Sequence, residues 1–114
     1  MGDLSPHFSR REFACKHCGM GAPVDHRLVE LLEKIRAISG KPLIIVSGSR
    51  CIPHNRAVGG VDGSQHVKGR AADIGPGRVD GHRARGLGAT GVGLRGQWAV
   101  HVDVRTSSPA TWRY

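Results

Sequence analysis

Aromatic side chains are scarce in this chain, where Phe, Trp and Tyr make up 4% of 114 residues. Surfaces that stack nucleic-acid bases usually interleave aromatic and basic side chains, so this scarcity argues against such a surface. No stretch approaches the roughly 20 apolar residues of a membrane-spanning helix. The first residues, Met1–Pro6, lack the basic-then-apolar order of a signal peptide. We therefore expect no membrane span and synthesis in the cytoplasm without an export signal.

Acidic residues are also few, because 9 Asp and Glu oppose 17 Lys and Arg and leave a formal net charge of +8. A basic surface attracts polyanions, so nucleic acid, anionic lipid and bacterial wall polymer are all candidate partners. The basic residues are scattered along the chain and are not grouped with aromatic residues. This distribution predicts no specific nucleic-acid binding.

Cysteine occurs only three times, so the thiols cannot all pair within the chain and a disulfide framework is not expected. Cys15 and Cys18 form a C-x-x-C pair, and Cys51 and His54 form a C-x-x-H pair. Three thiolates and one imidazole at these spacings could hold a second, structural zinc ion. The alternatives are a disulfide from Cys18 to Cys15 or to Cys51, or buried reduced thiols. His54 could instead lie at the rim of an active site.

The length suits one compact domain covering residues 1–114. Apolar residues recur at helical spacing between Val24 and Ile38, which predicts one main helix there. Asp25 is a suitable N-cap for this helix. Gly40 is suited to the left-handed backbone conformation that often ends a helix. We expect the helix to bury its apolar face against a sheet.

Short strands are expected after this helix. Residues 43–47 form a β-branched run that predicts a buried strand, and weaker strands are predicted at 70–74, 91–94 and 98–104, with a helical turn or two at 80–87. The connections are too short for β-α-β crossovers. The sequence therefore predicts an α+β domain with one main helix and short helical turns packed on a small, mainly antiparallel sheet.

Strand alternation groups several polar residues near the end of the chain. In the run 98–104, Val100, Val102 and Val104 should share one face and pack on the helix. Ala99, His101 and Asp103 should then share the other face. The small side chain at position 99 would leave room beside the two polar groups for a ligand or substrate.

A second group of polar residues precedes this strand. In the strand from Arg70, alternation places Ala71 and Asp73 on one side. Gly69 permits a tight turn that would bring His66 back over Asp73. Each of these residues, taken alone, has an ordinary structural interpretation as a loop histidine or a turn acceptor.

Taken together, His66, Asp73 and His101 form a two-histidine, one-carboxylate set. Such a set leaves the fourth position of tetrahedral zinc open for water, which is typical of a catalytic rather than a structural site. The metal would lower the pKa of that water and polarise a substrate carbonyl.

The string Ser64-x-His66-x-x-Gly69-x-Ala71-x-Asp73 followed by a late strand histidine resembles the zinc D-Ala-D-Ala carboxypeptidase family, which includes peptidoglycan endopeptidases and phage endolysins. The opening Leu4–Phe13, the central Ser47–Arg50 and the stretch His54–Gly60 also resemble its small members. The resemblance covers nearly the whole chain. It implies a zinc fold of the hedgehog and DD-peptidase type.

Carried over by position, the resemblance implies that His66, Asp73 and His101 bind zinc. Arg50 matches the family arginine that contacts the substrate carboxylate or carbonyl, a role for which its two parallel N–H donors are suited. Ser64 and Gln65 would lie at the rim and hydrogen-bond the peptide. The implied activity is hydrolysis of peptide bonds in peptidoglycan stem peptides or cross-links, as carboxypeptidase or endopeptidase. We expect a monomer that acts on the cell wall, with release during phage lysis as one route there.

The chain departs from the family at the general base. Family members often carry a Glu or Asp three residues before the last zinc histidine, or a histidine two before it, and here those positions are Trp98 and Ala99. Asp103 is the best substitute, because its carboxylate could take a proton from the attacking water. It could equally orient His101 through the second ring nitrogen. His82 and His54 are weaker candidates for moving a proton.

Two rival functions remain at this stage. The missing base also fits a catalytically silent zinc-binding module similar to the hedgehog signalling domain. A basic nucleic-acid protein is the third interpretation, and it predicts salt-sensitive binding that survives chelation.

Overall fold

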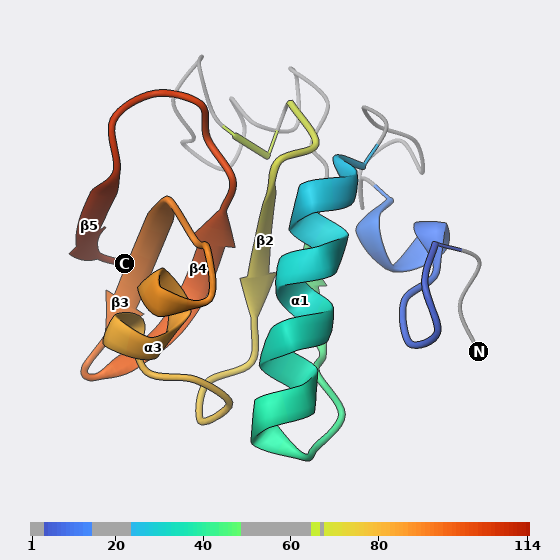
Figure 1. The fold of residues 1–114 in the computed structure, drawn as a ribbon, viewed down its shortest axis with the longest axis horizontal. Coiled ribbons are helices and arrows are strands. Elements are labelled where there is room, and N and C mark those ends of the chain that lie inside the picture. Colours follow the sequence, from blue (N-terminus) through green and yellow to red (C-terminus); the bar gives the residue numbers. More distant parts are fainter. Residues whose placement is uncertain (1–3, 15–23, 49–64, 67) are drawn as a thin grey trace.

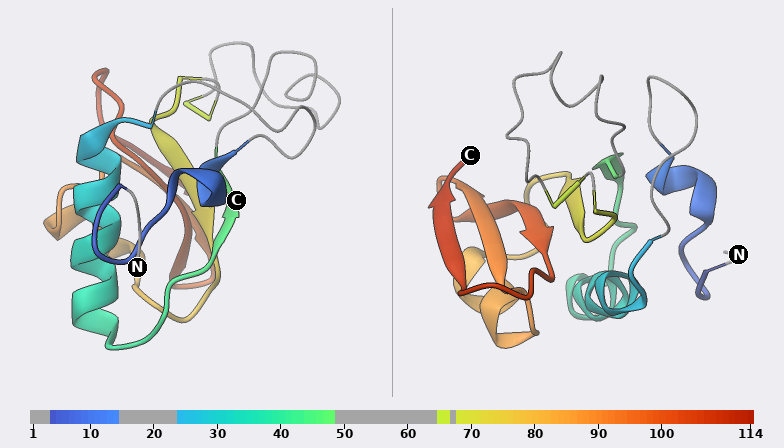
Figure 2. Two further views of the ribbon diagram at one scale, coloured as in Figure 1. Left: turned by 90° about the vertical axis from the view of Figure 1, so that its right-hand side faces the viewer. Right: turned by 90° about the horizontal axis from the view of Figure 1, so that it is seen from above.

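The computed structural model describes residues 4–14, 24–48, 65–66 and 68–114. Its elements are the 3-10 helix η1 (Arg10–Phe13), α1 (His26–Ser39), β1 (Ile45–Ser47), β2 (Ala71–Ile74), α3 (Gly81–Gly86), β3 (Gly91–Arg95), β4 (Trp98–Asp103) and β5 (Ala110–Arg113). The strands form one sheet, and α1 covers one of its faces (Figures 1 and 2). The α+β class predicted from the sequence is confirmed.

The main helix begins and ends where its sequence predicts. The Asp25 side chain accepts a hydrogen bond from the backbone N–H of Arg27 at 2.9 Å, which satisfies one N-terminal donor of α1. Gly40 follows the helix with a φ of 67°, a left-handed conformation that glycine adopts without strain. The apolar face is buried and contains Leu28, Val29, Leu31, Leu32 and Ile35.

The sheet has the strand order β1-β2-β4-β3-β5. All neighbouring pairs are antiparallel except β3 and β5, which are parallel. β5 was not predicted from the sequence, because its four residues of mixed polarity give only a weak local pattern. Pairing with β3 places this strand at the edge of the sheet, where it is visible beside β3 in Figure 1.

Apolar side chains from α1 and the sheet form the core. From the sheet, Ala72, Ile74, Val92 and Val102 join it, together with Val104 directly after β4. Phe8 and Phe13 from the amino-terminal segment add to it as an edge-to-face ring pair 6.3 Å apart. The prediction that Val102 and Val104 pack against the helix side is therefore confirmed.

The alternation expected for β4 is wrong at its amino-terminal half. The β3–β4 register shifts between Gly93, which pairs with His101, and Leu94, which pairs with Ala99. This irregularity gives β4 an extra residue, Val100, that has no partner on β3. The side chains before Val100 therefore point to the opposite face of the sheet from the one that simple alternation predicts. Ala99 consequently lies in the core and not beside His101.

The first strand is also less buried than predicted. Leu43 and Ile45 are buried, but Ile44 and Val46 are 61% and 51% exposed. A continuous apolar run suggested burial on both faces, whereas β1 lies at the edge of the sheet. Alternate side chains on such a strand can face solvent.

The segment before η1 is anchored to the outer side of α1 by Glu33. The Ser5 hydroxyl donates to Glu33 Oε2 at 2.5 Å, and the His7 backbone N–H donates to the same oxygen at 2.9 Å. His7 Nδ1 lies 2.7 Å from Glu33 Oε1. Burial alone would raise the pKa of Glu33, but these hydrogen bonds hold it below its usual range.

In the part of the chain that the structure describes, no helix is both long enough and apolar enough to cross a membrane.

Candidate metal site

The sheet face opposite α1 carries the polar residues of the site. Residues paired across strands point to the same face, and two such rows cross the sheet here. One row contains Ala71, Asp103, Gly91 and Ala110, and the other contains Asp73, His101, Gly93 and Trp112. The core residues Ala72 and Val102 lie between these rows along their strands and face α1. The second row therefore presents a carboxylate and an imidazole side by side.

A tight turn brings His66 to the same place. The backbone N–H of Gly69 bonds to the carbonyl of His66 at 3.3 Å, and that of Arg70 bonds to the carbonyl of Gln65 at 3.0 Å. Gly69 has a φ of 71°, which glycine adopts without strain. His66 Nε2 lies 3.3 Å from Asp73 Oδ1, so the turn places the histidine over the aspartate as predicted.

The other ring nitrogen of His66, Nδ1, has a partner in Gly48, the residue that follows β1. His66 Nδ1 lies 2.7 Å from the carbonyl oxygen of Gly48, a distance at which Nδ1–H donates. The ring is 2% exposed, so this bond fixes its orientation in a buried setting. Donation from Nδ1 leaves the Nε2 lone pair directed toward Asp73.

His101 lies between two carboxylates. Its Nδ1 is 3.0 Å from Asp73 Oδ1, and its Nε2 is 2.9 Å from Asp103 Oδ2. If Nε2–H donates to Asp103, the Nδ1 lone pair points at the same Asp73 oxygen that His66 faces. Two nitrogen lone pairs and one carboxylate oxygen then converge.

This convergence fits a metal ion. The ligand atoms offered by His66, Asp73 and His101 all lie within 4.8 Å of one another. Tetrahedral zinc with bonds of about 2.0–2.1 Å has its ligand atoms about 3.3 Å apart. The two separations from Asp73 Oδ1, 3.3 Å and 3.0 Å, are close to that value. Three electron-pair donors at this spacing repel one another unless a cation lies among them.

The electrostatics of the cluster also favour positive charge. Burial would raise the pKa of Asp73, but the neighbouring side chains of His101, His66 and Tyr114 hold it far below its usual range. Burial would lower the pKa of His101, but its bonds to Asp103 and Asp73 raise it above the ordinary value. The group therefore stabilises a proton or a metal cation in its centre.

Asp103 is a fully buried carboxylate with a paired guanidinium. Arg105 Nε donates to Asp103 Oδ1 at 2.8 Å, and Arg105 Nη2 donates to Oδ2 at 2.6 Å. Burial would raise the pKa of Asp103, but the bonds from Arg105 and His101 hold it far below its usual range. Its place behind His101, on the Nε2 side, favours the orienting role over the base role.

Two glycines on β3 were not recognised as site residues from the sequence. A Cβ at Gly91 would overlap the Asp103 carboxylate. A Cβ at Gly93 would lie 2.9 Å from the Cβ of His101 and 2.8 Å from Cδ1 of Tyr114. Glycine inside a strand often marks such close approach, so the alternation of Gly91 and Gly93 was the available signal.

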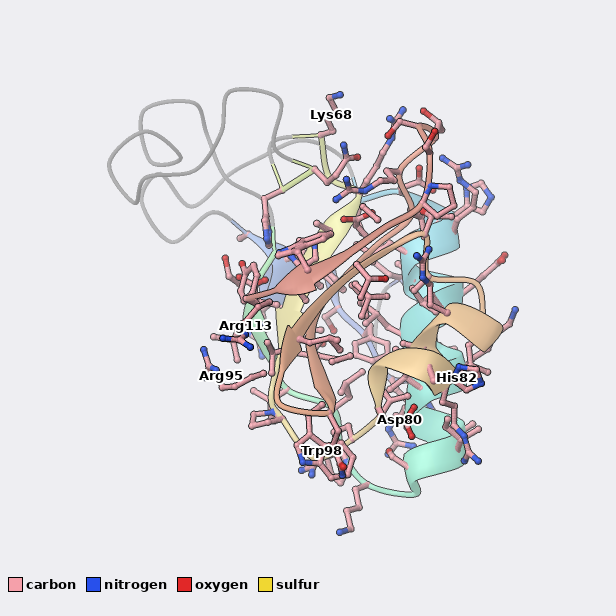
Figure 3. The ribbon with its side chains drawn as sticks, turned by 90° about the vertical axis from the view of Figure 1, so that its left-hand side faces the viewer. Lys68, Asp80, His82, Arg95, Trp98 and Arg113 are labelled. Atoms are coloured by element: carbon pink, nitrogen blue, oxygen red, sulfur yellow. The ribbon has the colours of Figure 1, made fainter. Side chains whose placement is uncertain are left out.

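The remaining predicted residues lie in different places. Gln65 is half-buried beside His66, and its Oε1 is buried without a hydrogen-bond partner among the described residues. His82 lies exposed on α3, at the outer surface in Figure 3. Six residues lie outside the described residues: Arg50, Ser64, Cys15, Cys18, Cys51 and His54. The predicted second zinc site and the substrate-binding arginine therefore stay predictions.

A scan against protein families matches residues 6–103 to the model described as Peptidase M15. The matched stretch contains η1, α1 and β1 to β4, together with His66, Asp73 and His101, and β5 follows it. A search of curated proteins finds no match.

Proposed function

Because the chain belongs to the peptidase M15 family, we propose that it is a zinc-dependent hydrolase of peptide bonds in peptidoglycan stem peptides or their cross-links. The observation that carries the proposal is the convergence of His66, Asp73 and His101 within 4.8 Å. These residues would hold the ion through Nε2, Oδ1 and Nδ1 respectively. When bound, zinc supplies Lewis acidity that activates water and polarises the scissile carbonyl.

The chain's own residues then orient the ligands. Gly48 holds His66 through its carbonyl, and Asp103 holds His101 through Nε2. Outer hydrogen bonds of this kind fix the ring and make the ligating nitrogen a better donor. Arg105 keeps Asp103 ionised and in place. We assign Asp103 to this positioning role and not to proton transfer from water.

Binding of the peptide is assigned to three residues by the family resemblance. Arg50 would anchor a substrate carboxylate or carbonyl, and Ser64 and Gln65 would hydrogen-bond the peptide backbone. The buried Oε1 of Gln65 supports this assignment, because a buried acceptor is costly unless a donor such as a peptide N–H reaches it.

The basic surface supports a cell-wall location. Arg95 and Arg113 are exposed on the neighbouring strands β3 and β5 and lie on one side of the molecule in Figure 3. With a net charge of +8, such side chains would hold the enzyme on anionic wall polymers. We propose that the protein acts there as a lytic enzyme, and that phage lysis is one setting for it.

The deciding experiment is digestion of purified sacculi by the zinc-loaded protein. New termini are identified by mass spectrometry, and metal content is measured on the same sample. New D-alanine or stem-peptide termini that disappear on chelation and return with zinc would support the proposal. Intact sacculi in the presence of a full zinc complement would contradict it.

A second candidate is a catalytically silent zinc-binding module. The specific observation in its favour is that Asp103 is engaged by His101 and Arg105, while Trp98 and Ala99 occupy the usual base positions. This candidate predicts one bound zinc, no hydrolysis of sacculi or of short stem peptides, and retained folding.

A further inference from the structure

Arg105 and Trp112 lie beyond the stretch that matches the family, yet both contact residues of the metal site. The match ends at residue 103, so it assigns no role to either of them. β5 pairs with β3 in parallel and places Trp112 opposite Gly93, which is itself opposite His101 on β4. Trp112 therefore belongs to the row of the sheet that carries His101.

Gly93 leaves the space in which aromatic rings approach His101. A Cβ at Gly93 would come within 2.9 Å of the His101 Cβ, so a larger residue would not fit there without displacing the histidine. The ring centroid of Trp112 lies 5.0 Å from that of His101, with 55° between the ring planes. The ring of Tyr114, directly after β5, lies 5.2 Å from the same imidazole. The imidazole therefore packs against rings that the β3–β5 pairing brings to it.

Trp112 also contacts the guanidinium of Arg105. The guanidinium carbon lies 5.0 Å from the centre of the Trp112 ring, which is within the range of cation–π attraction. The same guanidinium donates to both oxygens of Asp103, at 2.8 Å and 2.6 Å. Asp103 in turn lies 2.9 Å from His101 Nε2. The contacts therefore form a closed loop that runs from His101 through Asp103, Arg105 and Trp112 back to His101.

Arg105 is a solvent-exposed member of this loop. Its side chain is 20% exposed, whereas that of Asp103 is fully buried. Water that reaches the guanidinium can compete for the N–H donors that hold Asp103. The partly buried indole of Trp112 lies over the guanidinium and limits this access. The hydrogen bonds between Arg105 and Asp103 should therefore be stronger with Trp112 present than without it.

We propose that Trp112 is a positioning residue of the metal site, which acts through Arg105 and Asp103 to hold the orientation of His101. An imidazole that donates from Nε2 to Asp103 directs its Nδ1 lone pair toward Asp73, where the ligand atoms converge. Outer contacts of this kind fix a ligand and raise the affinity for metal. The inference rests on the metal site of the proposed function, but not on the identity of the substrate.

The first test compares zinc affinities, measured by competition with a chromophoric chelator. Trp112→Leu removes the aromatic face and should weaken zinc binding about 10-fold, whereas Trp112→Phe keeps such a face and should stay within about threefold of wild type. Trp98→Leu is the matched control, because it makes the same change beside the β3–β4 turn, where Trp98 pairs with Arg95. Figure 3 shows Trp98 at a different part of the sheet from Arg113, the neighbour of Trp112. The control should bind zinc as the wild type does.

A double-mutant cycle tests whether Trp112 acts through Arg105. Arg105→Gln alone should weaken zinc binding about 10- to 100-fold. If the two residues act as one unit, the double variant should lose much less affinity than the product of the two single losses. In the cobalt-substituted Trp112→Leu protein, the visible absorption bands should shift at saturating cobalt. A smaller folded fraction would lower these bands without moving them.

Solvent exchange of the Arg105 Nε–H proton, measured by NMR, separates this inference from the proposed function, because it can be read with or without zinc. Exchange should be faster in Trp112→Leu than in wild type and unchanged in Trp98→Leu. Unchanged exchange in Trp112→Leu, or single losses of affinity that multiply in the double variant, would overturn the inference. Equal losses in Trp98→Leu would overturn it too. Failure of the wild-type protein to bind zinc would instead refute the proposed function, and the exchange rates would still test the contact between Trp112 and Arg105.

Discussion

Gly91 lies directly opposite Asp103 in the β3–β4 ladder, and the space that its missing side chain leaves is filled by the Asp103 carboxylate. That carboxylate is fully buried and forms hydrogen bonds with His101 and Arg105. The orientation of His101 therefore depends on a glycine in another strand.

Gly91→Ala should disturb the site through Asp103. The added methyl would overlap the carboxylate, and overpacking of this kind typically costs about 1–3 kcal/mol of unfolding free energy. Zinc affinity should also fall, because Asp103 can no longer hold His101 in place. Urea denaturation and a chelator competition measure the two effects. Gly86→Ala is the control, since a Cβ there meets nothing within 4 Å and should leave zinc affinity unchanged.

Asp103→Asn separates the two roles considered for this residue. If Asp103 orients His101, zinc affinity should fall about 10- to 100-fold. A general base would instead leave zinc binding intact and lower the rate of hydrolysis about 10²- to 10⁴-fold. Affinity and turnover should be measured on the same preparation. Asp80→Asn makes the same change at the N-cap of α3 and should alter neither quantity.

Asp73→Asn should abolish stoichiometric zinc binding, because it removes the only charged ligand from the group of three. Metal content after dialysis against zinc should fall from about one ion per chain to nearly none, and hydrolysis should disappear with it. A variant that still holds one zinc per chain would refute the assignment of Asp73. The Asp80→Asn protein serves again as the control for loss of one carboxylate.

Glu33→Gln should loosen the segment before η1 in a pH-dependent manner. The pKa of Glu33 is held below its usual range, so its contribution to stability is present above that range and is lost as the pH falls through the lowered value. At pH 7 the variant should unfold about 1–2 kcal/mol more easily than wild type, and the difference should shrink in strong acid. Thermal melts from pH 2 to 7 measure it. A difference that stays constant, or that Glu30→Gln reproduces, would contradict the role of Glu33.

Local sequence patterns accounted for much of the fold. The α1 helix follows from its apolar spacing, and its ends follow from Asp25 and Gly40, all of which act within a few residues. The approach of His66 to Asp73 is local too, because one glycine turn connects them. The family resemblance rested on the same string, and the match to peptidase M15 confirms it.

Other features depended on pairing between distant segments. The irregularity at Val100 moved Ala99 into the core, and no pattern within β4 marks it. β5 is too short to be recognised alone and exists as a strand through its bonds to β3.

The sequence by itself therefore determined the family, the main helix and the set of candidate ligands, because each is encoded in neighbouring residues. Only the tertiary structure decided what surrounds His101: Asp103 behind it, Gly93 opposite it and Tyr114 over it. These contacts come from β4, from β3 and from the residue that follows β5. Their register is set by long-range hydrogen bonds and packing, which local patterns do not specify.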